Sequence, residues 1–314
     1  MEPFNQPDLS VHLGKVQLAN PVLTASGTCG YSMELRDFVD LTRLGGFITK
    51  SITLEPRPGN PPQRTCETHS GMLNAIGLAN VGLELFCEEK IPLLQRLPVP
   101  VPVFVNVAGK TIEEYVAVAS RLHQMEPVRG LELNVSCPNV REGGMTFGKD
   151  PRLLADLVGA VRRACPDTLL IVKLTPNVTD ITLLARAAVD AGADVLSLVN
   201  TFTGMAIDIE TRKPVLGNRV GGLSGPAIKP IALYLVHQVY QAVAKPAGIP
   251  LIGLGGITCA HDALEFILAG ATAVSVGTAV LVRPSCLVQI IDGIRTYLIR
   301  HRCKKVTEII GSLQ

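Results

Sequence analysis

Long apolar runs, closely spaced cysteines and an excess of one charge are all missing from this sequence. No stretch of eighteen apolar residues occurs, although the mean hydropathy is +0.33, because prolines and glycines interrupt each run. A membrane span is therefore not expected. The net charge of +2 over 314 residues forms no basic stripe, so nucleic acid is not expected as a partner either.

The eight cysteines are scattered, with no CxxC pair and no Cys/His spacing that suits zinc or an iron–sulfur cluster. We expect reduced thiols that mostly fill the core, and we predict no metal site. The N-terminal residues MEPFNQPDLS lack the positive and apolar segments of a secretory signal, so a cytoplasmic location is expected.

Apolar material for a sizeable core is plentiful, since 47% of residues are hydrophobic and only 18% are charged. It is concentrated in eight short runs rich in Val, Ile and Leu that alternate with segments of helical period. Runs this apolar are typical of parallel strands covered on both faces. They lie at residues 21–27, 46–52, 101–107, 131–136, 169–175, 195–201, 250–256 and 273–278.

The segments between the runs carry helix signals. Thr111 followed by Glu114 predicts a capping box, and Asp150 followed by Pro151 predicts an N-cap with proline at the first helical position. Further helices are predicted at residues 179–191, 226–244, 259–269 and 284–299.

Strands alternating with helices in this way predict the α/β class, and within it a (β/α)8 TIM barrel spanning residues 1–314 as a single domain. Two short alternating runs around Gly14 predict an N-terminal β-hairpin that closes the bottom of the barrel. A doubly wound open sheet is the second possibility, although no GxGxxG opens a helix after the first strand. Residues 54–80 and 204–225 are expected to be long irregular βα loops over the C-terminal face, and therefore functional.

Polar side chains occur at the ends of the first six predicted strands, where a barrel carries its catalytic groups. They are Ser26, Lys50, Ser51, Asn106, Asn134, Cys137, Lys173, Asn200 and Thr201. The last two strands end instead in bare glycines, at Gly255 and Gly256 and at Gly277 before Thr278. Bare glycines let backbone N–H groups approach an anion, so this strand pair is the predicted phosphate site.

The residue types at the strand ends limit the chemistry. Without a histidine or a carboxylate pair among them, metal-assisted hydrolysis and Ser/His/Asp catalysis are disfavoured. Lys50 or Lys173 could form a Schiff base, which leaves a lyase of the aldolase type possible. The asparagines offer donors and acceptors to a planar ring such as a flavin or a pyrimidine, and Cys137 is then the candidate base.

Six motifs in order along the chain carry a resemblance to a known family. They are TKSITLEPRPGNPPQR (49–64), GMLNAIGLAN (71–80), NVSCPN (134–139), IVKLTPN (171–177), VNT (199–201) and GLGGI (253–257). On these motifs the chain resembles the class 1B dihydroorotate dehydrogenases over essentially its whole length.

The resemblance implies one flavin mononucleotide (FMN) per chain and a pyrimidine beside it. The implied FMN contacts are Ser26, Lys50, Ser51, Asn106, Asn134, Lys173, Val199 and Gly225, with Gly255, Gly256, Gly277 and Thr278 around the phosphate. The implied substrate contacts are Lys50, Asn74, Ala75, Ile76, Gly77, Leu78, Asn134, Asn200 and Thr201. Cys137 is the implied catalytic base.

The implied reaction is the oxidation of dihydroorotate to orotate in de novo pyrimidine biosynthesis, with hydride passing from C6 to N5 of FMN. The resemblance further implies a homodimer that binds an electron-transfer subunit with FAD and a [2Fe–2S] cluster, giving a heterotetramer that reduces NAD⁺. Other readings remain possible at this stage: a fumarate-dependent class 1A enzyme, a dihydropyrimidine dehydrogenase-like barrel, the Schiff-base lyase and a barrel that serves only as a scaffold.

Overall fold

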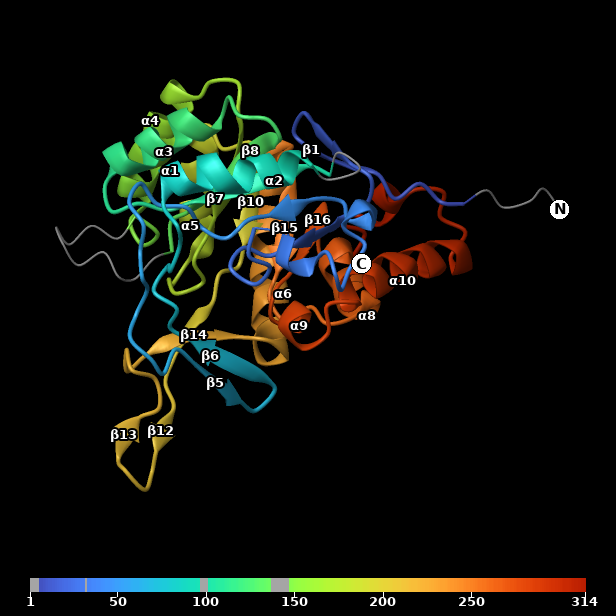
Figure 1. The fold of residues 1–314 in the computed structure, drawn as a ribbon. Coiled ribbons are helices and arrows are strands. Elements are labelled where there is room, and N and C mark those ends of the chain that lie inside the picture. Colours follow the sequence, from blue (N-terminus) through green and yellow to red (C-terminus); the bar gives the residue numbers. More distant parts are fainter. Residues whose placement is uncertain (1–5, 32, 97–100, 137–146) are drawn as a thin grey trace.

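Eight parallel strands form one sheet that curls into a barrel in the computed structural model, which describes residues 6–31, 33–96, 101–136 and 147–314 (Figure 1). In order of pairing they are β3 (Val22–Thr24), β16 (Ala273–Val276), β15 (Leu251–Leu254), β10 (Val195–Leu198), β9 (Leu169–Lys173), β8 (Val128–Asn134), β7 (Val103–Val107) and β4 (Phe47–Ile48). A parallel bridge between Leu23 and Gly46 joins β3 to the residue before β4. The predicted (β/α)8 barrel is confirmed, and the open doubly wound sheet is wrong.

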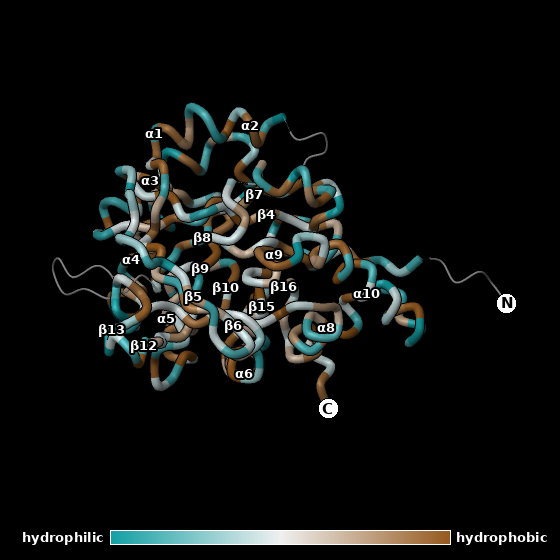
Figure 2. The backbone as a smooth tube through the Cα atoms, turned by 60° about the horizontal axis from the view of Figure 1, so that its bottom comes forward, coloured by the Kyte–Doolittle hydropathy of each residue, from teal (hydrophilic) through white to brown (hydrophobic). Residues whose placement is uncertain are grey.

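Burial on both faces explains why the barrel strands are so apolar. Every residue of β7, β9 and β15 is buried. Valine, isoleucine and leucine suit this environment because their branched side chains pack well on a pleated surface. Figure 2 shows apolar segments running through the central strands, whereas hydrophilic segments lie mainly toward the periphery.

Helices and helical turns surround the barrel. They are η1 (Met33–Leu35), η2 (Leu41–Arg43), α1 (Leu83–Leu85), η3 (Phe86–Lys90), α2 (Ile91–Gln95), α3 (Ile112–Leu122), α4 (Pro151–Ala164), α5 (Ile181–Asp190), η4 (Pro226–Ile228), α6 (Lys229–Val239), η5 (Tyr240–Ala244), α7 (Lys245–Ala247), α8 (Ala260–Leu268), α9 (Thr278–Val282), α10 (Cys286–Arg300) and η6 (Val306–Ile309). In the described part of the chain, none of them is long and apolar enough to cross a bilayer.

The predicted helix starts are found with one difference. The Asp150 carboxylate accepts hydrogen bonds from the backbone N–H groups of Arg152 and Leu153, at 2.8 and 3.3 Å, and so caps α4 as expected. At α3 the Thr111 hydroxyl accepts from the Glu114 N–H at 3.3 Å. The Glu114 carboxylate, however, accepts from Lys110 N–H instead of Thr111 N–H, so only half of the predicted capping box forms.

The N-terminal hairpin also forms as predicted. Strands β1 (Val11–Leu13) and β2 (Val16–Leu18) pair antiparallel around Gly14, whose φ is +52°. A Cβ on Gly14 would lie 2.8 Å from Cδ1 of Leu169, which begins β9. The hairpin therefore lies against the N-terminal end of the barrel, away from the carboxyl ends of the strands.

The two long segments expected to be irregular are in part strands. Strands β5 (Thr65–Thr68), β6 (Gly71–Asn74), β11 (Phe202–Gly204) and β14 (Gly221–Ser224) form an antiparallel sheet in the order β11-β14-β6-β5, called the outer sheet below. A separate hairpin of β12 (Ile207–Asp208) and β13 (Lys213–Pro214) projects from the molecule (Figure 1). The local sequence pattern did not predict the outer sheet, because β6 pairs with β14, which lies far away in the sequence.

We expect Asp150→Ala to lower the free energy of unfolding by about 1 kcal/mol, because the substitution removes the cap of α4. Urea denaturation monitored by circular dichroism measures the loss. Asp156→Ala, at an exposed position within the same helix, is the control and should cost nothing, since alanine is the better helix former. Equal losses in both variants would contradict the assigned cap.

Candidate active site

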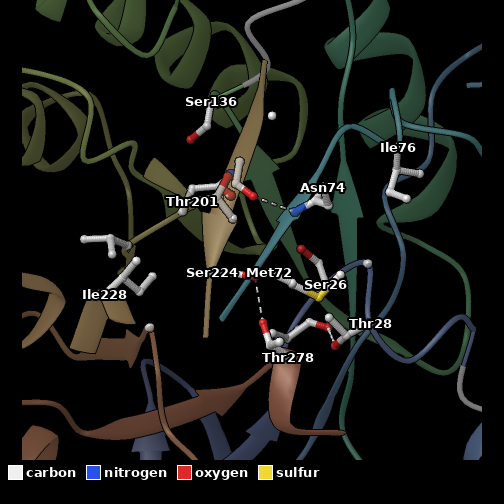
Figure 3. Close-up of a pocket in the computed structure, with 18 of the residues that line it drawn as sticks. Ser26, Thr28, Met72, Asn74, Ile76, Ser136, Thr201, Ser224, Ile228 and Thr278 are labelled. Carbon is white, nitrogen blue, oxygen red and sulfur yellow. Dashed lines mark hydrogen bonds between the residues drawn. The ribbon is translucent and has the colours of Figure 1, made fainter. Parts of the chain in front are cut away.

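A cavity of about 790 Å³ lies between the carboxyl ends of the barrel strands and the outer sheet. Figure 3 shows side chains from both layers: Ser26 and Thr278 follow barrel strands, and Asn74 and Ser224 belong to the outer sheet. Among the described residues that line the cavity, none comes from β7 or the loop after it. Each of the other barrel strands contributes to the wall, either with its own residues or with the residues shortly after it.

Most of the residues predicted for the site line this one cavity. They are Ser26, Lys50, Ser51, Asn74, Ala75, Ile76, Gly77, Leu78, Asn134, Lys173, Val199, Asn200, Thr201, Gly225, Gly255, Gly256, Gly277 and Thr278. Residues from position 26 to position 278 therefore meet in one place, as expected for the mouth of a barrel.

The predicted base, Cys137, lies outside the described residues. Ser136, directly before the gap, and Gly148 with Lys149, shortly after it, line the cavity. Ser136 is held there by its backbone N–H, which donates to Asn134 Oδ1 at 3.3 Å.

Asn106, which the sequence placed in the wall, is buried behind it. Its amide donates to Glu132 Oε1 at 2.6 Å, and its amide oxygen accepts from the Ser51 hydroxyl at 2.5 Å. The side chain is fully buried, and Glu132 and Ser51 occupy its donor and acceptor sides. Asn106 is not among the cavity residues and is linked to the wall through Ser51, so its direct contact with a cofactor stays a prediction.

A chain of side-chain amides and hydroxyls forms one side of the cavity. The Asn134 amide donates to Ser51 Oγ at 3.3 Å, and the Asn200 amide donates to Asn134 Oδ1 at 3.4 Å. These bonds fix which way each amide faces. The remaining donor and acceptor capacity of Asn134 and Asn200 can serve a planar heterocycle.

Lys173 provides a buried positive charge in the cavity. Its side chain is 5% exposed, and Nζ donates to Ser26 Oγ at 3.2 Å. Glu132 Oε1 lies 3.8 Å from Nζ on the side of the barrel core. Because β9 ends at Lys173, the strand carries this cation directly to the carboxyl end of the barrel.

Lys50 supplies a second cation. Burial lowers the pKa of its ammonium group, and the nearby positive charge of Arg64 lowers it further. Both effects disfavour the charged form, and a bound carboxylate would favour it. This end of the cavity therefore suits an anionic ligand.

The two glycines that follow β15 lie too close to α6 to carry a side chain. Gly255 and Gly256 have φ values of +130° and +78°. A Cβ on Gly256 would lie 2.7 Å from Cβ of Lys229, and one on Gly255 would lie 2.6 Å from Cβ of Ala232. Next to these glycines on the lining, the Thr278 hydroxyl donates to Ser224 Oγ at 2.8 Å. Exposed backbone amides and hydroxyls are the donor set that holds a phosphate.

An ion-pair cluster that the sequence analysis did not predict holds residues 255–258 after β15, called the phosphate loop below, against α6 and α8. Lys229 Nζ donates to Asp262 Oδ1 at 2.7 Å and to Glu265 Oε2 at 2.6 Å. The other Asp262 oxygen accepts from the N–H and hydroxyl of Thr258, at 2.8 and 2.7 Å, and Thr258 lines the cavity. Burial raises the pKa of Asp262, but the hydrogen bonds from Lys229 and Thr258 outweigh it and bring the pKa to about 2.

Two signals in the sequence could have pointed to further site residues. Glu132 is a charged residue inside a buried strand, which is rare enough to notice. Thr175 and Asn177 follow β9 directly and line the cavity. Lys229 carries no such signal, because its role depends on how α6 packs beside α8.

The chain matches known proteins over nearly its full length. The family model for dihydroorotate dehydrogenase matches residues 8–298. A protein of Pelobacter propionicus named dihydroorotate dehydrogenase B (NAD(+)), catalytic subunit, is 55% identical over 309 residues, which are 98% of this chain and 99% of that protein. Proteins with the same name from Geotalea daltonii, 54% identical over 309 residues, and Bacteroides fragilis, 52% identical over 307 residues, cover 98% of this chain and 99% of their own lengths.

We expect Asp262→Asn to destabilise the protein in a pH-dependent way. The pKa of Asp262 is lowered from 3.8 to about 2, so its stabilising effect is fully present above about pH 4 and is lost as the pH falls toward 2. The difference in unfolding free energy between wild type and variant should therefore be constant above about pH 4 and shrink below it. Urea denaturation across this range measures it.

Asp37→Asn is the control for this experiment, because the Asp37 side chain is 79% exposed and its contact with Arg36 is at the surface. It should show little difference from wild type at any pH. A difference for Asp262→Asn that does not change between about pH 5 and pH 2.5 would contradict the assigned ion pair.

Proposed function

The chain belongs to the dihydroorotate dehydrogenase family, and we propose that it oxidises dihydroorotate to orotate in de novo pyrimidine biosynthesis, passing the electrons to NAD⁺ through a partner subunit. The names of its full-length relatives support the NAD⁺-dependent type. The observation that carries the proposal is that a phosphate cradle, Lys173 and the amides of Asn134 and Asn200 line one cavity. The whole chain, residues 1–314, would act as a single barrel domain in the cytoplasm.

We propose one FMN per chain as the cofactor. The glycine cradle fits its phosphate, and the amides, Ser26 and Lys173 fit the polar edge of its ring system. When bound, FMN supplies the hydride acceptor of the reaction. Lys173 holds a fixed positive charge in a buried position, which stabilises negative charge nearby far better than the same cation in water could.

The substrate would lie between the barrel and the outer sheet. Lys50 would bind its carboxylate, because an anion would stabilise the ammonium group that burial and Arg64 disfavour. Asn74 is held by a hydrogen bond from its amide to Gly222 O at 3.2 Å, so its amide oxygen remains available. The segment from Asn74 to Leu78, together with Asn134, Asn200 and Thr201, would then orient the pyrimidine by hydrogen bonds and contact.

Cys137 is proposed as the general base that takes the C5 proton while the C6 hydrogen leaves as hydride. The support is its place in the sequence, directly after Ser136, which lines the cavity. A thiol acts as a base only when its pKa is near the working pH, so the site has to favour the thiolate.

The partner is proposed to be an electron-transfer subunit that carries FAD and a [2Fe–2S] cluster, bound to a homodimer of this chain in a heterotetramer. The name "catalytic subunit" of the relatives supports a second subunit. The scattered cysteines of this chain fit a cluster held elsewhere.

We expect Cys137→Ala to retain FMN and to lose flavin reduction by dihydroorotate by about a hundredfold or more, the usual contribution of a general base. Stopped-flow absorbance of the flavin after mixing with dihydroorotate measures the rate. Cys303→Ala, a partly buried cysteine that is not among the cavity residues, is the control and should reduce its flavin at the wild-type rate. A Cys137→Ala protein that reduces its flavin normally would remove Cys137 from the mechanism.

We expect Gly256→Ala to abolish or strongly weaken FMN binding, because the backbone has φ +78° and the new methyl group would meet Lys229. The flavin absorbance of the purified variant and its titration with FMN measure the effect. Gly248→Ala is the matched control: it has φ +67° and no atom of the described residues lies within 4 Å of the new Cβ, so it bears a similar backbone strain away from the cavity. Unchanged FMN affinity in Gly256→Ala would contradict the phosphate cradle.

Purification from the native host tests the proposed acceptor. Co-purification with a subunit that holds FAD and iron, and turnover that needs NAD⁺, are the expected results. Turnover with fumarate alone would indicate the class 1A reaction, and preference for dihydrouracil would indicate the dihydropyrimidine dehydrogenase type. A colourless protein trapped by borohydride on Lys50 or Lys173 would indicate the lyase and contradict the whole proposal.

A further inference from the structure

We propose that Glu132 is a positioning residue that tunes the reduction potential of the flavin by partly neutralising Lys173. The proposal rests on the proposed function, since it assumes FMN in the cavity. Glu132 does not line the cavity and would touch neither cofactor nor substrate. Glu132 would act on the flavin indirectly, by reducing the effective positive charge of Lys173.

The position of Glu132 in the barrel is the first observation. It lies on β8 two residues before Asn134, so both side chains point to the same face of the strand. Its Cα partners in the sheet are Asn106 on β7 and Ile171 on β9. The side chain is fully buried, where a carboxylate is rarely found without a charge partner.

The contacts of the two carboxylate oxygens are the second observation. Oε1 accepts from the Asn106 amide at 2.6 Å and lies 3.8 Å from Lys173 Nζ. Oε2 has no hydrogen-bond partner among the described residues. A buried ion pair with an unsatisfied oxygen is a poor way to stabilise a fold, because an apolar side chain of similar size would avoid the desolvation cost. The arrangement is better explained by an effect on Lys173.

The surroundings of Lys173 are the third observation. Nζ donates to Ser26 Oγ on the cavity side, and Glu132 is the one acidic group paired with it in the described part of the chain. The pair is separated by 3.8 Å and carries no direct hydrogen bond, so the ammonium keeps donors for a ligand. In a buried site the carboxylate weakens the attraction that Lys173 exerts on negative charge in the cavity.

The consequence concerns the two redox forms of the flavin. Reduction adds electrons to the ring, and a bare lysine would favour the more negative form strongly. With Glu132 behind it, Lys173 favours that form less, and the potential stays lower. Removing the negative charge at position 132 should therefore raise the midpoint potential of bound FMN.

The test compares Glu132→Gln with Glu132→Asp in the purified FMN-loaded protein, by reductive titration against a dye of known potential. Glu132→Gln keeps the shape and the acceptor for Asn106 but removes the charge. It should raise the FMN potential by about 30 mV or more, which corresponds to a tenfold change in the relative affinity for reduced and oxidised flavin. Glu132→Asp keeps the charge and should lie closer to wild type. If Glu132 only filled space, the shorter Asp would change the FMN potential more than the isosteric Gln would.

A control and a double variant complete the test. Ser197→Ala, which removes a buried hydroxyl that has no hydrogen-bond partner among the described residues, on β10 next to β9, should leave the potential unchanged. In a Lys173→Met background, measured with FMN in excess, Glu132→Gln should no longer raise the potential. An unchanged or lowered potential in Glu132→Gln, or the same rise with and without Lys173, would overturn the inference. A protein that binds no FMN, in contrast, would overturn the proposed function itself.

Discussion

The close approach of β3 to the residues just before β4 closes the barrel, and the site depends on that closure. The Gly45 N–H donates to Val22 O at 3.0 Å, and Leu23 bridges to Gly46. A Cβ on Gly45 would lie only 1.9 Å from Asn20 O, so the contact requires glycine. Because the closed sheet is parallel throughout, the carboxyl ends of its strands meet around one mouth. Lysines, amides and glycines from distant parts of the chain are brought together there.

A second constraint comes from burial. Polar side chains inside the barrel have lost water, so each needs a partner from a neighbouring strand. The resulting series runs from Glu132 through Asn106 and Ser51 to Asn134 and Asn200. These hydrogen bonds link the apolar core to the cavity wall and orient the amides before any ligand binds. Lys173, whose Nζ lies 3.8 Å from Glu132 Oε1, places a positive charge at the cavity end of this series, and Glu132 balances it on the core side.

The outer sheet forms the other wall of the cavity. Asn74 pairs with Gly222 across β6 and β14, and a Cβ on Gly222 would lie 2.1 Å from Thr201 Oγ1. Two segments that read as irregular loops therefore hold each other in place over the barrel. This pairing gives the proposed substrate contacts a regular backbone support, which a free loop would lack.

The sequence by itself determined the barrel, the hairpin beneath it, most helix starts and most of the cavity residues. Apolar strands, helix caps and polar strand ends are local patterns that can be read from the order of the residues. Only the tertiary structure decided that Asn106 supports the wall from behind, that Lys229 and Asp262 fasten the phosphate loop, and that the two long segments pair as strands. Glu132 shows the difference: its charge is visible in the sequence, but its distance to Lys173 is not. Contacts between strands and helices far apart in the chain depend on register and packing, which no local pattern of residues specifies.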